Sequence, residues 1–282
     1  MLKRTALRGL VAALLMAMGM GAAIAQTLTI PNFWDPNERF VKPDLGKRQR
    51  VLFLTTTDFP PFNFVDRKKR LSGFHVDLAR EICNALDIIG RCQIQALPWN
   101  ELEQAVEDGE GEAIIAGLAV TEANRSRYGF SRSYLRFPAR FVMRRADAVS
   151  EPLYRKLAGE RVGVVAGSAH ERALRDLFPE MKPVTYSRGE WMFDDLKDGK
   201  IAAVFSDGMR LGFWLAGSSS QRCCRFAGGP YLAPEYFGDG LAIAAPADRP
   251  ELVQAFDYAL REINAKGKFA EFYLRYFPVS FF

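Results

Sequence analysis

Short apolar runs alternate with helical patterns along most of this chain, and the alternation occurs twice. The first series starts with the β-rich run 51–55, and the second starts with the run 162–165. Each series follows the order strand, turn, helix, strand, helix, strand. Strands that alternate with helices are typical of parallel sheets in α/β proteins. The pattern therefore predicts two similar α/β lobes rather than one continuous sheet.

The remaining elements are predicted from local patterning. Further short apolar runs predict strands at 92–97, 112–116, 137–143, 184–186, 201–205 and 241–245. Apolar residues at helical spacing predict helices at 76–86, 99–106, 190–196, 249–267 and 268–276. Ser168 and Glu171 match a capping box, which predicts that a helix begins there.

The N-terminus matches a bacterial secretory signal peptide. The basic residues Lys3, Arg4 and Arg8 precede an apolar run at 11–20, and an A-x-A cleavage motif follows at 23–25. The run is short for a membrane span, so a retained N-terminal anchor is the weaker alternative. No Cys follows the cleavage motif, which disfavours a lipid anchor. We therefore expect a mature protein in the periplasm.

Charge and histidine content disfavour two classes of partner. Removal of the three basic leader residues lowers the formal net charge from +5 to +2, since the leader holds no acid. No dense basic stripe interleaved with aromatic residues is present, which disfavours nucleic acid. The run Arg67–Arg70 is expected on a solvated turn. The two histidines, His75 and His170, lie in no ligand-spaced cluster, so no metal and no cofactor are expected.

Four cysteines permit disulfides in an oxidising compartment. Cys83 and Cys92 flank a predicted helix end and the strand that follows it, and this arrangement could bring them together. Cys223 and Cys224 are adjacent and could form a vicinal disulfide. Four cysteines allow three pairings, and the sequence does not choose among them.

The order and spacing of several segments resemble those of a known family. The matching segments are 55–62, 73–78, 98–102, 112–121, 130–131, 162–168, 201–207, 240–243 and 252–277. Together they cover most of residues 50–280 and resemble the family-3 extracellular solute-binding proteins, which are periplasmic receptors for polar amino acids in ABC importers. Each segment alone is a weak signal, whereas their shared order is specific.

The resemblance implies the two-lobed periplasmic binding protein fold (type II), in which two α/β domains are joined by two crossover hinge segments. The expected organisation is a signal peptide at 1–25 and an N-terminal arm at 26–49. Lobe 1 is expected to hold 50–138 plus 239–282, and lobe 2 to hold 139–238. A ligand would lie between the lobes, and hinge motion would close them on it.

The resemblance also implies ligand-binding positions in lobe 1. Phe59 and Phe74 match positions where aromatic rings line the pocket, although core packing is the competing interpretation for both. Asp58 could add an acid at the pocket mouth. His75 stands where the family has an acid, and we expect it at the surface.

A second implied contact region begins at Gly117, between a predicted strand end and a helix start. Backbone N–H groups there suit a carboxylate. Ala119 stands where the family has a hydroxyl residue, and Asn124 stands where it has a carboxylate-binding Arg. Arg125 follows one residue later. Either Arg125 bends back into the site, or the carboxylate contact is missing.

In lobe 2, the resemblance implies that Ser168 contacts the ligand and that Asp207 binds its α-amino group. The competing interpretations are a plain helix cap for Ser168 and a turn residue for Asp207.

Three functions remain open from the sequence. The first is a non-catalytic, monomeric receptor that captures an amino acid or related small polar solute and delivers it to an ABC permease. The second is a periplasmic enzyme on the same fold, similar to cyclohexadienyl dehydratases. The third is a degenerate binding domain that acts as a sensor or accessory protein, which Ala119 and Asn124 favour slightly.

Overall fold

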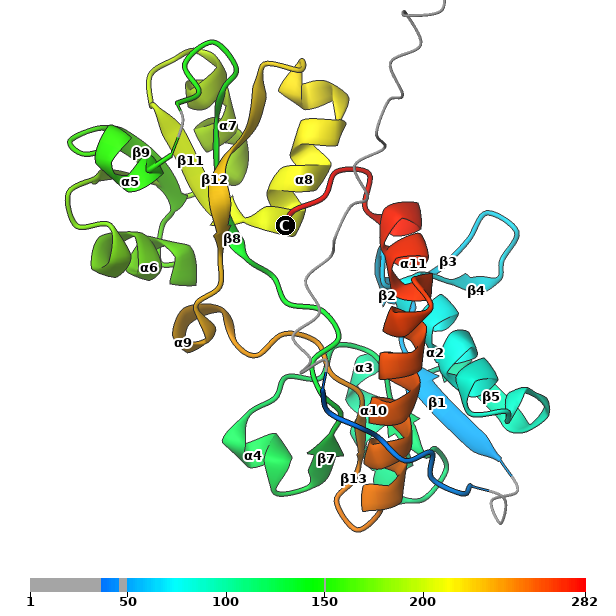
Figure 1. Ribbon diagram of the computed structural model, residues 1–282. Helices are drawn as coiled ribbons and strands as arrows, with labels where there is room; N and C mark the ends of the chain where they lie inside the picture. The colour runs from blue at the N-terminus through cyan, green and yellow to red at the C-terminus, as the bar shows by residue number, and fades with distance from the viewer. Residues whose placement is uncertain (1–36, 46–49, 150) are drawn as a thin grey trace, which may run out of the picture.

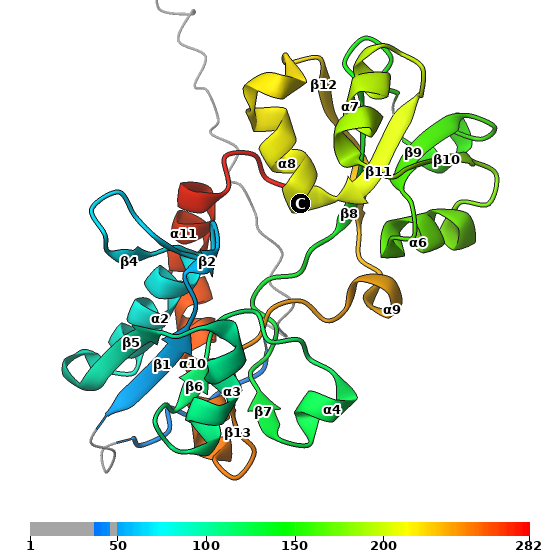
Figure 2. The same ribbon diagram turned by 180° about the vertical axis from the view of Figure 1, so that it is seen from behind.

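The computed structural model describes residues 37–45, 50–149 and 151–282. The predicted signal peptide and the start of the predicted arm lie outside the described residues. Figures 1 and 2 show two lobes, each built on its own sheet and linked by extended segments. Within the described part of the chain, no helix has the length and hydropathy needed to cross a membrane.

The sheet of lobe 1 has five strands in the order β5-β1-β6-β13-β7. They are β5 (Cys92–Ala96), β1 (Val51–Thr55), β6 (Ala113–Ile114), β13 (Ala244–Pro246) and β7 (Tyr128–Phe130). β1 pairs in parallel with β5 and β6, whereas β13 is antiparallel to β6 and β7. All five residues of β1 are buried, as expected for a parallel strand covered on both faces.

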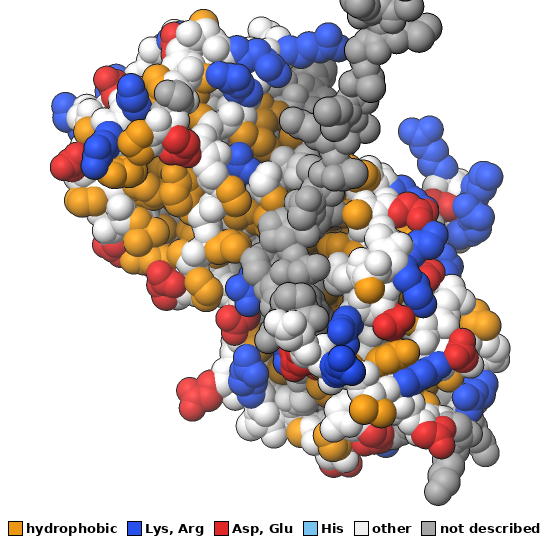
Figure 3. Space-filling view, in the orientation of Figure 1, with side chains coloured by type: hydrophobic (Ala, Val, Ile, Leu, Met, Phe, Trp, Pro, Cys, Tyr) orange, Lys and Arg blue, Asp and Glu red, His pale blue; other side chains and the backbone are white. Residues whose placement is uncertain are grey.

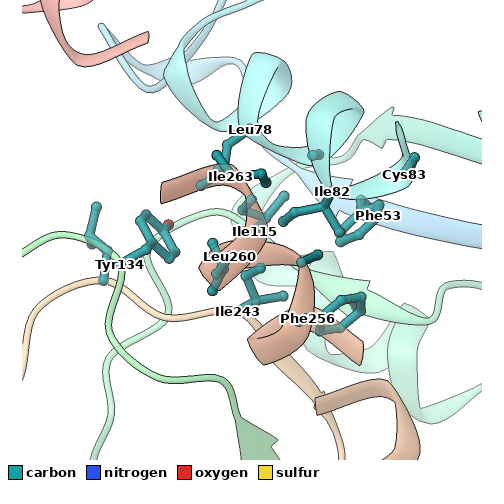
Figure 4. Close-up of a cluster of buried hydrophobic side chains, with 14 of the residues drawn as sticks. Phe53, Leu78, Ile82, Cys83, Ile115, Tyr134, Ile243, Phe256, Leu260 and Ile263 are labelled. Carbon is teal, nitrogen blue, oxygen red and sulfur yellow. The ribbon is translucent and has the colours of Figure 1, made fainter. Parts of the chain in front are cut away.

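Helices cover the two faces of this sheet. α2 (Phe74–Ala85), α10 (Pro250–Ala265) and α11 (Lys268–Tyr276) pack on the face that holds Phe53, while α3 (Trp99–Glu107) packs on the face that holds Leu52. Figure 4 shows the larger core, where side chains of α2 and α10 meet β1. Its labelled members are Phe53, Leu78, Ile82, Cys83, Ile115, Tyr134, Ile243, Phe256, Leu260 and Ile263.

The sheet of lobe 2 repeats this plan in the order β10-β9-β11-β8-β12. Its strands are β10 (Lys182–Tyr186), β9 (Arg161–Val165), β11 (Ala203–Asp207), β8 (Ala139–Arg144) and β12 (Cys224–Tyr231). β9, β10 and β11 are parallel, and β8 is antiparallel to β11 and β12. Its helices are α5 (Leu153–Lys156), α6 (Ala169–Leu177), α7 (Gly189–Lys197) and α8 (Gly208–Ala216).

A small hairpin sheet extends from lobe 1. β2 (Asp58–Phe59), β3 (Asn63–Val65) and β4 (Leu71–Ser72) pair in sequence. The turn Arg67–Arg70 between β3 and β4 is exposed, and Figure 3 shows Lys and Arg side chains projecting at this hairpin. The prediction of a solvated basic turn is confirmed.

Within the described residues, three segments connect the lobes. The first crossover (131–138) enters β8, and the second (232–243), which contains α9 (Pro234–Phe237), enters β13. The crossovers pair with each other, since Leu241 donates its N–H to the carbonyl of Leu135 at 2.7 Å. The C-terminal segment is the third, because Arg140 of β8 donates to the carbonyl of Phe281 at 3.0 Å.

Both disulfides join cysteines that are close together in the sequence. The Cys83–Cys92 disulfide links α2 to the start of β5, with 6.1 Å between the Cα atoms. The second disulfide is vicinal, between Cys223 and Cys224. The structure therefore contains one of the three pairings that the sequence left open.

The structure contains elements that the sequence patterns did not predict, among them α5, α8, α9, β7, β12 and the hairpin sheet. It also corrects the expectation for His75, which is 0% exposed rather than at the surface. The ring of His75 lies 2.5 Å from the amide oxygen of Asn63 and 2.8 Å from the hydroxyl of Tyr134. Burial lowers the pKa of His75 to about 3, so the ring is neutral at physiological pH.

Candidate ligand-binding site

The carboxyl ends of the parallel strands in both lobes point toward the crossovers. Ala244, the first residue of β13, pairs with Ile114, the last residue of β6. Asp207, the last residue of β11, pairs with Ala139, the first residue of β8. Because the crossovers deliver the chain to β13 and β8, the strand ends of each lobe face the other lobe (Figure 2). We call these surfaces the lobe 1 edge and the lobe 2 edge.

Ligands of open α/β sheets bind outside the carboxyl ends of the strands. The candidate site is therefore the space between the two edges, and its walls are the loops and helix starts that follow β1, β5 and β6 in lobe 1 and β9, β10 and β11 in lobe 2.

Phe59 and Gly117 lie together on the lobe 1 edge. Phe59 is half-buried and stacks on Phe62 with 4.7 Å between ring centroids. A Cβ atom on Gly117 would lie 3.1 Å from Cε1 of Phe59, and the φ of Gly117 is +89°. Glycine is needed here for both reasons, since L side chains rarely adopt this φ. The close approach fixes the ring of Phe59 against the strand end of β6.

Trp99 is an aromatic residue on the lobe 1 edge that the sequence analysis did not single out. It begins α3, directly after β5, and is 47% exposed. The signal available in the sequence was a Trp just beyond a predicted strand end, and this signal becomes informative only once β5 is known to neighbour β1. Asp58 is exposed beside Phe59 on the hairpin strand β2.

The segment after Gly117 uses its polar groups to build α4 (Glu122–Arg125). Thr121 caps this helix by accepting the N–H of Asn124, and the side-chain amide of Asn124 donates to the carbonyl of Ala119 at 2.8 Å. The side chain of Arg125 lies 3.6 Å from Asp239 of the second crossover. Arg125 and Asp239, together with Ser133 and Arg136, line a cavity of about 390 Å³ beside the crossovers.

Ser168 caps α6 on the lobe 2 edge. Its hydroxyl donates to the carbonyl of Val165 at 2.7 Å and accepts the N–H of Glu171 at 3.1 Å. The carboxylate of Glu171 accepts the N–H of Gly167 at 2.8 Å. The predicted capping box is therefore present, with the Glu171 contact shifted one residue earlier than in the usual pattern.

Asp207 caps α8 on the same edge. One carboxylate oxygen accepts the N–H of Arg210 at 2.8 Å. The side chain is largely withdrawn from solvent, and this desolvation raises the pKa of Asp207 despite the hydrogen bonds from the helix start and the charge of Arg210. A cationic group beside Asp207 would restore the stability of its charged form.

His170 also lies at the lobe 2 edge, in the first turn of α6. Its ring stacks on Phe237 of α9 at 4.8 Å. Burial and the nearby charge of Arg210 lower the pKa of His170 to about 4. The ring is thus neutral at pH 7 and packs against the second crossover.

Phe74 does not reach the candidate site. It is 0% exposed and packs in the lobe 1 core against rings that include Phe62, Tyr134 and Phe269. The core-packing interpretation holds for Phe74, because it begins α2 on the face that meets α11. Phe74 is therefore a core residue and not part of the candidate site.

Among residues 37–45, 50–149 and 151–282, no cluster of three or more His, Cys, Asp or Glu side chains is arranged to hold a metal ion. The candidate site thus consists of aromatic and backbone groups on the lobe 1 edge and charged groups at helix starts on the lobe 2 edge.

Two lobes with facing strand ends, joined by paired crossovers, define a solute receptor of the two-lobed periplasmic binding class. The chain belongs to the bacterial extracellular solute-binding proteins, family 3, whose sequence model matches residues 51–279. The prediction of this family and of its fold is confirmed.

Named relatives agree with this assignment. The chain is 27% identical over 230 residues to ABC transporter arginine-binding protein 1 of Escherichia coli, covering 82% of this chain and 91% of that protein. It is 27% identical over 221 residues to the L-arginine-binding protein of Pseudomonas aeruginosa, covering 78% and 84%. These relatives are named as binding proteins, which agrees with the family of solute-binding receptors to which the chain belongs and gives the enzyme alternative no support.

The fold also matches solved structures. The L-cystine solute receptor of Neisseria gonorrhoeae, in its unliganded open conformation, superimposes with a TM-score of 0.69 at 14% identity, covering 81% of this chain and 92% of that one.

Proposed function

We propose that this protein captures an amino acid between its two lobes in the periplasm and delivers it to the permease of an ABC importer. Lobe 1 comprises 50–138 plus 239–282, and lobe 2 comprises 139–238. Periplasmic export rests on the predicted signal peptide and on the family. The receptor acts as a monomer in this scheme, since one chain supplies both edges.

The observation that carries the proposal is the placement of Asp207. A desolvated carboxylate with a raised pKa stands at the end of β11, on the edge that faces the other lobe. An ammonium group is the natural partner for such a carboxylate, because a charge-assisted hydrogen bond offsets its desolvation. The α-amino group of an amino acid supplies that ammonium.

The lobe 1 edge supports a cationic side chain on the ligand. Phe59 and Trp99 stand after the neighbouring strands β1 and β5, and aromatic faces attract guanidinium and ammonium groups. The relatives named above bind arginine according to their names, which supports the same class.

Isothermal titration of the mature protein with the L-amino acids tests the proposal. We expect L-arginine or another cationic amino acid to bind best. Asp207→Asn keeps a good helix cap, so it should fold normally yet bind about 10- to 150-fold more weakly, the value of a lost charge-assisted hydrogen bond. Asp198→Asn is the matched control. Asp198 is exposed and follows the C-terminal end of α7, away from the candidate site, so this variant should bind normally.

Absence of binding to every L-amino acid would contradict the proposal. It would favour the third alternative, a degenerate domain with a sensor or accessory role. Equal binding by wild type and Asp207→Asn would instead contradict the assignment of Asp207.

A further inference from the structure

Arg210 carries a cationic group that lies across the lobe 2 edge. It occupies the first turn of α8, one turn after Asp207, and helical side chains lean back toward the helix N-terminus. A Cβ atom on Gly189 would lie 2.5 Å from an Arg210 guanidinium nitrogen and 3.3 Å from its Cζ. The guanidinium therefore rests directly on the start of α7.

The sheet order makes this position central. Gly189 follows β10 and Arg210 follows β11, and β9 lies between these two strands. α7 and α8 pack side by side on one face of this sheet, where Phe193 stacks on Trp214 with 4.4 Å between ring centroids, and the side chain of Arg210 joins the starts of these two helices. The charge of Arg210 contributes to the lowered pKa of His170 in the first turn of α6.

The charge of Arg210 acts on Asp207, where it lowers the pKa of the carboxyl and opposes the effect of desolvation. No ion pair within 4.0 Å found among residues 37–45, 50–149 and 151–282 includes Arg210, and its side chain is exposed and next to a second helix start. The N-terminal ends of α6 and α7 carry partial positive charge of their own. A cation held beside them is unfavourable by itself and is stabilised when an anion binds between them.

The lobe 1 edge offers no equivalent group at the segment where the carboxylate contact was expected. Arg125 is paired with Asp239 on the second crossover, and Asn124 donates its amide to the carbonyl of Ala119. The two cations differ in this respect, because Arg125 forms an ion pair with an acid of the second crossover and Arg210 forms none within 4.0 Å among the described residues.

We infer that Arg210 is the carboxylate-binding residue of this receptor and that lobe 2 holds both ends of the amino-acid backbone, the ammonium on Asp207 and the carboxylate on Arg210. This inference rests on the proposed function. Asp207 and Arg210 present opposite charges one helical turn apart, which matches a zwitterion. Phe59 and Trp99 of lobe 1 are then left to contact the ligand side chain.

The test compares L-arginine with L-argininamide, which lacks the carboxylate charge, by isothermal titration. Wild type should prefer L-arginine by about tenfold or more, and Arg210→Ala should bind L-arginine about 10- to 150-fold more weakly and lose the preference. Arg225→Ala, at an exposed position on β12 in the same lobe, is the control and should keep both.

Gly189→Ala is an independent variant that leaves every charge in place. The three atoms nearest to its new Cβ all belong to the Arg210 side chain, so the substitution displaces the guanidinium with little other disturbance. It should reduce the preference for L-arginine over L-argininamide, as Arg210→Ala does. A thermal midpoint measured for each variant identifies any that fails to fold, and the conclusion then rests on the other one.

The failures of the two proposals are distinguishable. If Arg210→Ala or Gly189→Ala keeps the wild-type preference while Asp207→Asn loses affinity, the inference about Arg210 is overturned and the proposed function stands. If wild type binds neither L-arginine nor L-argininamide, the inference is overturned together with the cationic amino-acid ligand on which it rests.

Discussion

The two lobes share a sheet plan but use their polar residues differently. On the lobe 1 edge, Asn124 bonds to the backbone and Arg125 pairs with a crossover acid. On the lobe 2 edge, Asp207 caps a helix yet keeps a raised pKa, and no ion pair within 4.0 Å among the described residues includes Arg210. The comparison teaches that lobe 1 uses its polar groups to hold its fold, while lobe 2 keeps charge available for a ligand.

The buried polar cluster of lobe 1 should show the largest effect on stability. His75 joins Asn63 of β3 to Tyr134 of the first crossover. His75→Ala leaves both partners buried without the ring and opens a cavity, so we expect a loss of about 3–5 kcal/mol in the free energy of unfolding. Urea unfolding measures it. A loss below about 1 kcal/mol would contradict the structural role of this cluster.

The two disulfides provide a second contrast between the lobes. Cys83–Cys92 closes a loop with a sequence separation of 9, whereas Cys223–Cys224 closes none. Replacing the first pair by alanine should cost about 2–3 kcal/mol through loop-closure entropy, and replacing the second should cost less than about 1 kcal/mol. Equal losses in thermal unfolding would show that loop closure is not the main contribution.

The histidines predict how stability depends on pH. The pKa of His75 is about 3 in the folded protein, against an unfolded value of 6.5. Below pH 6.5, His75 is protonated in the unfolded chain but stays neutral in the folded protein. The free energy of unfolding should therefore fall by about 1.4 kcal/mol for each unit that the pH decreases between 6.5 and 3. The difference in unfolding free energy between wild type and His75→Gln should shrink as the pH falls through this range.

His170→Gln is the lobe 2 counterpart. The pKa of His170 is about 4 in the folded protein. His170 should therefore also lower the free energy of unfolding as the pH falls below 6.5, but this decrease should stop near pH 4 rather than near pH 3. A pH-independent difference between wild type and His75→Gln would contradict a buried neutral His75.

The smallest effect is expected for Arg125. The side chains of Arg125 and Asp239 are 58% and 50% exposed, and pairs of this kind contribute at most about 1 kcal/mol. Arg125→Ala should leave amino-acid affinity within about twofold of wild type, a change below 0.5 kcal/mol. A large loss of affinity by calorimetry would instead favour the alternative in which Arg125 bends into the site.

Local patterning was sufficient to predict most of the fold. The two strand–helix series define the two sheets, and Ser168 and Glu171 form the predicted cap. α8 was not predicted because Gly208 and Gly212 weaken its helical signal. Tertiary packing explains why both positions are glycine. A Cβ on Gly208 would lie 2.9 Å from the carbonyl oxygen of Pro138, and a Cβ on Gly212 would lie 3.3 Å from the carbonyl oxygen of Val279.

The candidate site was predicted less completely, because it depends on which strands are neighbours. Trp99 and Arg210 follow different strands, and only the sheet orders bring them to the two edges. His75 could have been found from periodicity, since it shares a helical spacing with Leu78 and Ile82 on the buried face of α2. The polarity of His75 instead favoured a surface position, because a buried histidine needs hydrogen-bond partners. Its partners, Asn63 and Tyr134, lie elsewhere in the chain and are not visible in the local pattern.

The central claim is that an amino acid draws the two edges together, and small-angle X-ray scattering of the mature protein tests it most directly. The account predicts that saturating L-arginine lowers the radius of gyration of wild type, and that Asp207→Asn at the same concentration stays as extended as the unliganded protein. An unchanged scattering profile for wild type, under conditions where calorimetry shows the site to be occupied, would contradict it.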